Sequence, residues 1–334
     1  MHYIFFIDGS SYKPMYEAML RDVINMEDVS IVCDKRVRNR MKWLLLKRKA
    51  QFITKGYLDI LGYEENCLFT EIKKQCELGK QVVVCFFNGA LHHNEYLAGT
   101  LIRYKKKFHN LRYVLYYTDI INSAVSKNAY YLQKKNIFDY VYTVDEADSV
   151  RNSMILWPTL YSVEPDYYKC HLNQDIYFCG VSKGRGKLLI ECLKEARYCG
   201  VDVAMDIICY DDADDYLEYT DYIDIRTPDK YLSYPEVLRR ELSAKCILEI
   251  VQKGQVALTL RPYEAVAYNK KLLTNNKTIL NFKYYNPKYM RYFEKVEDID
   301  WNWVKCDDGV DYNYQGDFSP RYLLADIEKN LSKK

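Results

Sequence analysis

Two features common in other protein classes are missing from this sequence. No apolar run approaches the roughly 18 residues that a membrane-spanning helix needs, so we expect no transmembrane segment. The 11 cysteines include no Cys-x-x-Cys pair, and several, such as Cys85 and Cys179, lie inside apolar runs. This pattern is typical of buried thiols in a reducing cytosol and not of a disulfide framework. The start, MHYIFFIDGSS, turns polar too soon for a secretory signal, so we expect a cytoplasmic protein.

The sequence also has little net charge. A formal charge of +2 predicts no polyanionic partner for the whole molecule, and no nucleic acid. Residues 1–160 hold 23 Lys and Arg against 17 Asp and Glu, and the remainder 25 against 29, so the first half is expected to face something anionic. Phe (12) and Trp (4) are few beside 34 Tyr, which we interpret first as compositional drift and second as a sugar- or base-stacking surface.

Apolar runs of strand length alternate with helical patterns along the chain. The predicted strands are Tyr3–Ile7, Val29–Cys33, Gln81–Phe87, Arg112–Tyr117, Tyr140–Thr143, Asp175–Gly180, Val203–Cys209, Tyr222–Ile225, Cys246–Ile250 and Lys271–Thr274. The predicted helices are Glu64–Leu78, Asn94–Lys107, Lys187–Cys199, Tyr234–Leu242, Ala257–Tyr268 and the amphipathic tail Pro320–Leu331. Continuous apolar strands separated by helices indicate parallel sheets that are covered on both faces.

A polar stretch around residues 161–174 interrupts this rhythm, and the pattern then restarts. The sequence therefore predicts the α/β class, with two Rossmann-like doubly wound domains facing a cleft. We expect an N-terminal domain over 1–160, a second domain over 170–315, and a C-terminal helix within 316–334 that packs back on the first domain. Ligands of such sheets bind outside the carboxyl ends of the strands.

The first candidate site follows the strand that ends at Gly180. The segment IYFCGVSKGRGK runs from that strand into a glycine-bearing turn with Lys183, Gly184 and Arg185, and a helix follows. Glycines let backbone N–H groups approach an anion, the helix N-terminus favours it, and the two cations could neutralise a diphosphate. The segment is neither a P-loop, because its glycines are one residue too far apart and Leu follows Lys187, nor a dinucleotide fingerprint. A solvated basic turn remains the alternative.

The second candidate site lies between the predicted strands Cys246–Ile250 and Lys271–Thr274. A polar, glycine-bearing loop leads into a helix whose start is rich in hydrogen-bonding groups, and the candidate residues are Gln252, Gly254, Gln255, Thr259, Arg261 and Glu264. A carboxylate such as Glu264 can accept two hydrogen bonds from a ribose diol, and Arg261 can clamp a phosphate through two N–H groups. The alternative is that Glu264 only pairs with a cation on a helix face.

The segment 254–276 resembles the donor-binding element of GT-B glycosyltransferases, in which a glycine-rich loop, a helix bearing a ribose-binding Glu and a following strand occur together. Together with FCGVSKGRG, it resembles the bacterial enzymes that build lipopolysaccharide core, O-antigen or capsule. The resemblance covers roughly 175–280 and is only architectural over 1–160. It implies that Glu264 binds the ribose, that Arg261, Thr259 and Gln255 lie near the phosphates or sugar, and that Lys183 and Arg185 contact the diphosphate.

The sequence departs from that family in one respect. Many retaining members carry Glu-x7-Glu ending at the ribose Glu, whereas Val256 stands eight positions before Glu264 here. Inverting transfer needs a base for the acceptor's proton. Asp119 and Asp8 end predicted strands of the first half directly, and His92 follows a third, so these are the candidates. Each has a structural alternative, the carboxylates as turn or cap residues and the histidine as a surface loop.

Two charged runs have competing interpretations. Residues 211–215, DDADD, resemble a metal-binding cluster, but we favour a solvated acidic loop and predict no metal site. Residues 35–49, KRVRNRMKWLLLKRK, suit peripheral docking on an anionic membrane at the inner face of the cell membrane, or equally a basic helix covering the sheet.

Together these features predict a glycosyltransferase that moves a sugar from a nucleoside-diphosphate sugar, with UDP the expected nucleotide, to a glycan or lipid-linked acceptor in surface polysaccharide assembly. We expect no cofactor beyond this donor substrate. The alternatives are a nucleotide-sugar epimerase or polyol-phosphate transferase on the same scaffold, and a non-catalytic nucleotide-binding protein.

Overall fold

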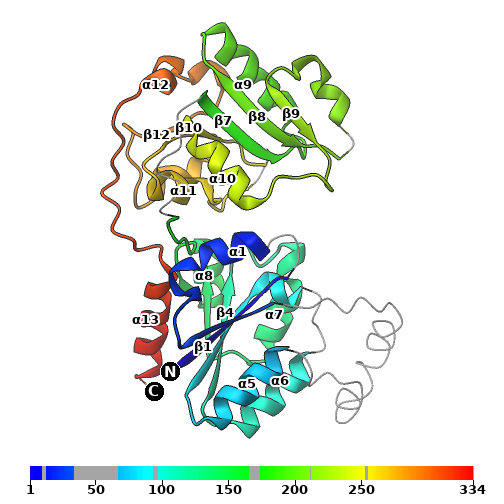
Figure 1. Ribbon diagram of the computed structural model, residues 1–334, viewed down its shortest axis with the longest axis vertical. Helices are drawn as coiled ribbons and strands as arrows, with labels where there is room; N and C mark the ends of the chain where they lie inside the picture. The colour runs from blue at the N-terminus through cyan, green and yellow to red at the C-terminus, as the bar shows by residue number, and fades with distance from the viewer. Residues whose placement is uncertain are drawn as a thin grey trace. The chain divides into compact units, whose positions relative to one another are not determined.

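The computed structural model of the 334-residue chain describes residues 1–9, 13–33, 67–92, 97–164, 174–210, 212–252 and 255–333. The chain forms two compact units (Figure 1). Unit 1 consists of Met1–Leu160 together with Leu323–Lys334, and unit 2 of Tyr161–Tyr322. The two units are described in turn.

Unit 1 is built on a six-stranded sheet in the order β2-β1-β3-β4-β5-β6, with every neighbouring pair parallel. Its strands are β1 (His2–Ile7), β2 (Val29–Cys33), β3 (Val82–Phe87), β4 (Leu111–Tyr117), β5 (Tyr140–Thr143) and β6 (Ile155–Leu156). Its helices are α1 (Lys13–Met19), α2 (Arg21–Ile24), α5 (Cys67–Glu77), α6 (Leu97–Lys107), α7 (Lys127–Lys134), α8 (Glu146–Asn152) and α13 (Pro320–Leu331).

Both faces of this sheet are buried, which explains why its strands are apolar throughout. Ile4 and Phe6 of β1 point to the core that α5, α6 and α7 cover. Tyr3, Phe5 and Ile7 alternate with them and point to the core that α1, α2 and α13 cover. Figure 1 shows α13, in red, beside β1, and the Tyr3 hydroxyl donates to the Glu328 carboxylate at 2.8 Å.

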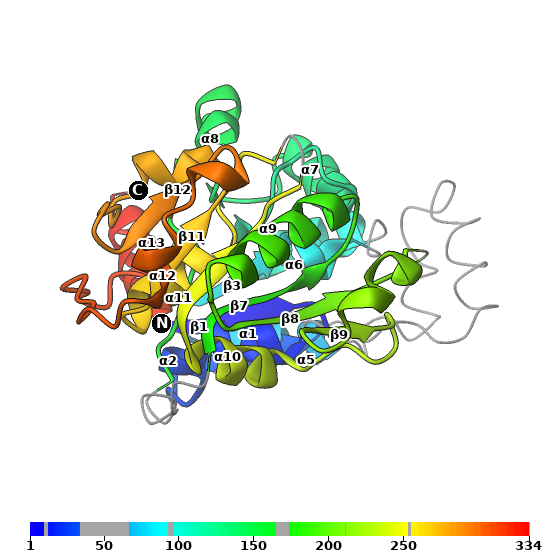
Figure 2. The same cartoon turned by 90° about the horizontal axis from the view of Figure 1, so that it is seen from above.

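Unit 2 carries a second six-stranded sheet, in the order β12-β11-β10-β7-β8-β9, and every neighbouring pair is again parallel. Its strands are β7 (Gln174–Val181), β8 (Val203–Ile208), β9 (Ile223–Arg226), β10 (Ala244–Glu249), β11 (Lys271–Thr274) and β12 (Met290–Tyr292). Its helices are α9 (Gly186–Tyr198), α10 (Tyr234–Leu242), α11 (Arg261–Ala267) and α12 (Trp301–Lys305). Figure 2 shows α9 and α10 on opposite sides of β7 and β8.

The two doubly wound parallel sheets confirm the predicted α/β fold class. The helix predicted over 257–268 is wrong at its start, because α11 begins at Arg261. The preceding residues are fixed as a loop by side chains: the Thr259 hydroxyl donates to Glu249 and accepts from the Arg261 N–H, and the Asn276 amide donates to the Ala257 carbonyl. Pro262 then lies in the first turn of α11, where its missing N–H is not needed.

Candidate functional site

The switch point of the unit 2 sheet lies between β7 and β10. From β7 the chain proceeds outward to β8 and β9, and it then returns to place β10 on the other side of β7. The connections that leave the carboxyl ends of these two strands therefore diverge, which is where open α/β sheets leave room for a ligand. Both candidate segments of the sequence begin at these two ends, one after Val181 and the other after Glu249.

Arg185 joins the two strand ends. Its guanidinium donates to the carbonyl oxygens of Val181 and Ile250 and, at 3.3 Å, to that of Ser182, and it lies over the Phe178 ring at 5.5 Å. Burial lowers the pKa of Arg185, and the neighbouring positive charge of Arg261 lowers it further. Arg185 is thus half-buried and bonded to backbone carbonyls, and its contact with a diphosphate stays a prediction.

The turn before α9 has an unusual backbone conformation. Lys183 (φ 35°) and Gly184 (φ 75°) are both left-handed, and the Lys183 side chain is exposed. Gly186 begins α9, and no side chain caps this N-terminus. A Cβ at Gly186 would lie 2.6 Å from the Tyr216 hydroxyl, so only glycine fits. The first N–H groups of α9 are consequently left with the partial positive charge of a helix start.

The loop after β10 is anchored by a buried carboxyl. Glu249 accepts hydrogen bonds from the hydroxyls of Thr259 and Thr274, and its burial raises its pKa although these hydroxyls oppose the shift. Gln252 is half-buried and Gln255 is exposed, while Gly254 lies outside the described residues. The hydroxyl of Thr259, predicted to hold phosphate, is therefore engaged in fixing the loop itself.

Arg261 lies between two buried carboxyl groups, Glu241 of α10 and Glu264 of α11. Its guanidinium is 2.8 Å from Glu241 and 2.6 Å from Glu264, and the side chains of both acids are 0% exposed. The Tyr234 hydroxyl donates to the other Glu264 oxygen at 2.7 Å. Burial raises the pKa of Glu241 well above its ordinary value, opposed by Arg261 and reinforced by Glu264. The group therefore has one cation facing two carboxyls in a water-poor setting.

This burial bears on the predicted ribose contact. Glu264 lies on the predicted helix and near Arg261, as the sequence requires, but both of its oxygens are already bonded to Tyr234 and Arg261. Each of those oxygens could accept a second hydrogen bond, but the Glu264 side chain is 0% exposed, so a ribose could reach it only if neighbouring side chains moved. Direct contacts of Glu264 and Arg261 with a nucleotide remain predictions.

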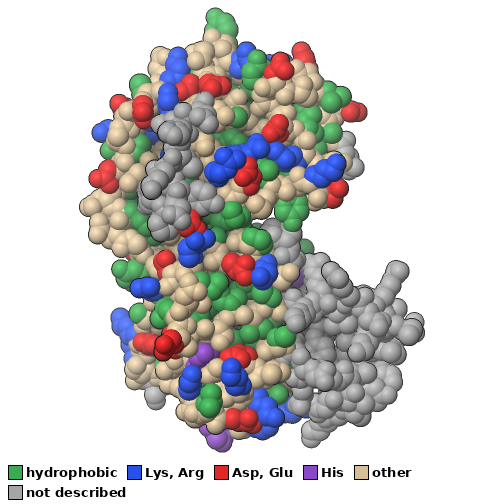
Figure 3. All heavy atoms as spheres, viewed as in Figure 1, with side chains coloured by type: hydrophobic (Ala, Val, Ile, Leu, Met, Phe, Trp, Pro, Cys, Tyr) green, Lys and Arg blue, Asp and Glu red, His purple; other side chains and the backbone are tan. Residues whose placement is uncertain are grey.

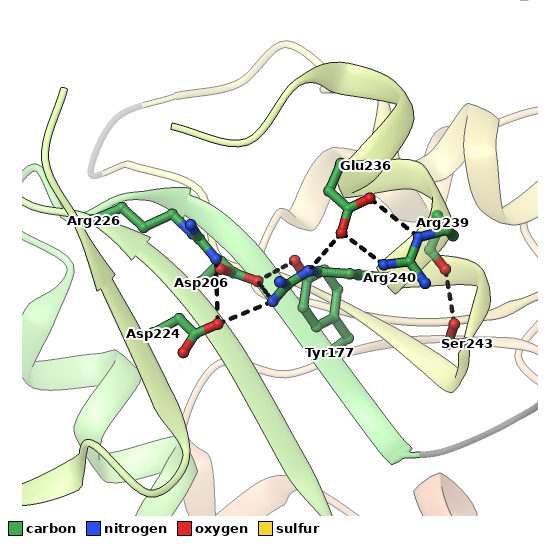
Figure 4. Close-up of polar contacts among 8 residues, drawn as sticks. All are labelled: Tyr177, Asp206, Asp224, Arg226, Glu236, Arg239, Arg240 and Ser243. Atoms are coloured by element: carbon green, nitrogen blue, oxygen red, sulfur yellow. Dashed lines mark hydrogen bonds and ion pairs between the residues drawn. The ribbon is translucent and has the colours of Figure 1, made fainter. Parts of the chain in front are cut away.

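A second polar network, which sequence reasoning missed, lies on one face of β8 and β9 beneath α10 (Figure 4). Asp206 is 1% exposed; it accepts from the Tyr177 hydroxyl at 2.6 Å, Arg226 at 2.5 Å and Arg240 at 2.9 Å. Arg226 and Arg240 also reach the exposed Asp224. Figure 3 shows basic and acidic side chains gathered on this face of unit 2. Its charges are paired, so we interpret the network as structural.

We expect Asp206→Asn to lower the unfolding free energy by about 2–3 kcal/mol, because two arginines lose their shared carboxylate and one amide N–H2 would face guanidinium donors. Asp224→Asn is the matched control. Asp224 is 57% exposed, so its loss should cost at most about 1 kcal/mol. Urea denaturation of the three proteins measures both values; equal losses would show that burial of Asp206 contributes nothing.

In unit 1, Asp8 and Gly89 meet at the corresponding switch point, between β1 and β3. Asp8 directly follows β1 and is half-buried. A Cβ on Gly89 would lie 2.9 Å from the Tyr16 hydroxyl and 3.8 Å from the Asp8 Cβ. Glycine at position 89 thus allows the turn after β3 to approach Asp8 and Tyr16 closely.

The other two base candidates lie farther along the same carboxyl edge. Asp119 follows β4, is exposed, and accepts from the Ile120 N–H at 2.8 Å, as a turn residue does. His92 follows the turn after β3, and its carbonyl accepts from the Asn128 amide. The buried Asn88 is a feature that the sequence did not single out: its Oδ1 accepts from the Thr118 N–H and hydroxyl, which ties the ends of β3 and β4 together.

Several sequence-based expectations fall outside the described residues, namely the basic segment 35–49 and, in the acidic run, Asp211. Asp212 of that run accepts from the Ser182 hydroxyl at 2.8 Å. Among the residues with described placement, no three His, Cys, Asp or Glu side chains gather as metal ligands. No helix in the described ranges has the length and apolar character needed to cross a bilayer.

No family model and no curated protein matches the sequence. Solved structures do resemble the fold. A glycosyltransferase from Rickettsia africae ESF-5 has a TM-score of 0.56 at 11% identity, over 100% of this chain and 99% of that one. An alpha-glucosyltransferase in complex with UDP-glucose and DNA containing an abasic site has a TM-score of 0.53 at 12% identity, over 99% of both chains.

A further structure, an alpha-glucosyltransferase in complex with UDP and a 13-mer DNA with a central A:G mismatch, has a TM-score of 0.55 at 13% identity, over 91% of this chain and 90% of that chain. At such identities the likeness concerns the fold alone. The chain has the two-domain α/β fold of GT-B glycosyltransferases.

Proposed function

We propose that the protein is a glycosyltransferase that binds a nucleoside-diphosphate sugar at the switch point of unit 2. The observation that carries this proposal is the convergence of the two candidate segments: the left-handed turn at Lys183 and Gly184 and the loop after Glu249 leave adjacent parallel strands, β7 and β10. The similarity in fold to glycosyltransferases, two of them solved with UDP or UDP-glucose, supports it.

In this proposal the diphosphate contacts the exposed Lys183 and the uncapped N–H groups at the start of α9. The half-buried Arg185 contributes its charge from behind the turn, while Gln252 and Gln255 line the second loop. These groups would stabilise the negative charge that grows on the leaving nucleotide, without a metal ion or another cofactor. UDP is the nucleotide we propose.

For the transfer itself we propose Asp8 as the base. The acceptor hydroxyl attacks the anomeric carbon, its proton passes to the Asp8 carboxylate, and the bond from that carbon to the donor phosphate breaks with its electron pair leaving on the nucleotide. This order of bond making and bond breaking is the one that sugar transfer with inversion requires. Asp8 is favoured over the exposed Asp119 because it is half-buried at the unit 1 switch point beside Gly89.

The acceptor we propose is a glycan or lipid-linked glycan of surface polysaccharide assembly, on the resemblance of the donor segments to enzymes of that kind. One solved structure of similar fold is an alpha-glucosyltransferase in complex with UDP-glucose and DNA, so DNA belongs in the acceptor screen. Release of free sugar or formation of a sugar isomer without any acceptor would favour a hydrolase or an epimerase. Nucleotide binding without turnover would favour a non-catalytic role.

We expect UDP to raise the thermal transition of the protein by several degrees, because a ligand at about 100 times its Kd stabilises by about 2.7 kcal/mol. GDP, dTDP, CDP and CMP at the same concentration should give smaller shifts. Lys183→Gln should weaken UDP binding about tenfold, since it removes one charge-assisted contact to phosphate. Thermal shift and calorimetric titration measure these effects.

Lys187→Gln is the matched control, because Lys187 is 91% exposed one residue into α9 and pairs with Glu191. It should leave the UDP affinity within about twofold. If no nucleotide shifts the transition, or if the two lysine variants behave alike, the proposed donor site is wrong.

A further inference from the structure

The C-terminal turns of three neighbouring helices of unit 1 bring lysines to the amino edge of its sheet. Helices α5, α6 and α7 each end just before the parallel strand that follows, and the Phe69 and Tyr104 rings of α5 and α6 lie 4.8 Å apart. The Lys105 ammonium donates to the Ile137 carbonyl beyond α7 at 2.8 Å. The amino-edge lysines, all exposed, are Lys73, Lys74, Lys80, Lys106, Lys107, Lys134 and Lys135.

Acidic side chains do not balance these lysines. Glu77 is exposed at the end of α5, whereas Asp139 is paired with Lys105 at 2.9 Å and Glu71 accepts from Ser30 and Gln75. Within the part of the chain that the structure describes, only Lys74 of the set has an acid within reach, 3.8 Å from Glu71. Glu27, which is exposed, and Asp28 precede β2 at the same edge, where burial and Lys80 lower the pKa of His2 and Asp28 raises it. Seven exposed lysines against these few acids leave the described part of the edge with an excess of positive charge.

Favourable interaction with the helix dipole accounts for lysines in the last turns of α6 and α7. It does not account for Lys80, which lies in the loop before β3. The mutual repulsion of the amino-edge lysines is relieved when an extended anionic surface faces them.

Apolar side chains are exposed among these lysines. Leu78 is 63% exposed at the end of α5, Tyr131 50% on α7 and Ile102 38% on α6. Ile102 and Tyr131 each stand four residues before an amino-edge lysine, hence on the same helix face. We propose that this edge docks on an anionic lipid bilayer, with lysines at the headgroups and the apolar side chains at the interface.

A bilayer fits this surface better than a nucleic acid does. A lysine ammonium lies over one face of three aromatic rings at the edge: Lys107 lies 5.1 Å from the Phe108 ring centroid, Lys134 4.9 Å from Tyr130, and Lys135 5.2 Å from Tyr131. Base stacking needs open aromatic faces, and readout of phosphate geometry favours arginine over lysine. Headgroup attraction needs neither.

The test is sedimentation of the full chain with vesicles of phosphatidylcholine, alone or mixed equally with phosphatidylglycerol. We expect binding only to the mixed vesicles, and loss of most of it at about 1 M salt, where the Debye length is about 3 Å. Replacing Lys106, Lys107, Lys134 and Lys135 together by Gln should weaken partitioning at least about tenfold, since each basic residue near the surface contributes about fivefold.

The control replaces Lys194, Lys230, Lys277 and Lys295 by Gln, which changes the net charge equally at exposed positions of unit 2. It should bind vesicles like the wild type, and Glu77→Lys should bind more tightly. Equal losses in both quadruple variants, or no preference of the wild type for anionic vesicles, would overturn the proposal. So would tighter binding to duplex or single-stranded DNA that the amino-edge variant abolishes. Because the edge is remote in sequence from the donor segments, this outcome is independent of the proposed function.

Discussion

Replacement of Arg261 by methionine should lower the unfolding free energy by about 3–5 kcal/mol, the usual cost of removing one partner from a buried ion pair. In the described structure Arg261 is the cation bonded to both Glu241 and Glu264, whose side chains are fully enclosed. Methionine fills similar volume, so the loss would report charge and hydrogen bonding more than a cavity. Urea denaturation at neutral pH, followed by far-UV circular dichroism, measures the difference.

The pH dependence of stability provides the control. Burial raises the pKa of Glu241, so the native state retains a proton that the unfolded chain releases. This contribution to stability is complete below the ordinary Glu pKa of about 4.3 and is lost as the pH rises towards the raised pKa. Glu241→Gln removes the titration and should flatten the curve, and it should lessen the cost of Arg261→Met. A loss below about 1 kcal/mol in the single Arg261 variant would contradict this account.

Asp8→Asn should reduce sugar transfer by about 10²–10⁴-fold, the range that a positioned general base contributes. Asparagine keeps the size of the side chain but cannot take up the acceptor's proton. Affinity for UDP should stay unchanged, because Asp8 belongs to unit 1 and the proposed donor loops to unit 2. Initial rates with a competent acceptor, measured beside UDP titrations, separate the two effects.

Asp119→Asn is the matched control. Asp119 is an exposed carboxylate that follows β4, which β3 separates from β1 in the sheet, and it accepts a hydrogen bond from the Ile120 N–H. Its rate should stay within about threefold of the wild type, as for surface substitutions generally. The opposite result, with Asp119→Asn inactive and Asp8→Asn active, would move the base to the other strand end.

Most of the sheet framework was predictable because its strands are continuous apolar runs. Val29–Cys33, Tyr140–Thr143 and Lys271–Thr274 have the predicted bounds, and so do the helices Tyr234–Leu242 and Pro320–Leu331. The edge strands β6 and β12 were not predicted. They contain two and three residues, too few to show a pattern.

The polar interior was much harder to predict, since its partners are far apart in the sequence. Arg261 meets Glu241 twenty positions away, and Asp206 meets Tyr177 and Arg240 from different elements. The sequence did indicate Arg261 and Glu264 as polar residues near the predicted donor site. It did not indicate that they bond to each other and to Glu241, because only packing decides which carboxylates are buried. The sequence alone likewise could not indicate that Arg185 bonds to carbonyls on two strands.

The placement of α13 in unit 1 has a consequence for synthesis. Unit 2 is one continuous stretch, Tyr161–Tyr322, and is complete when its last residue leaves the ribosome. Unit 1 is made first but lacks Leu323, Leu324 and Ile327, which are fully or almost fully buried in its core. The earlier part of the chain must therefore wait, with the part of one sheet face that α13 covers still open, until α13 emerges, so unit 1 reaches its native state after unit 2.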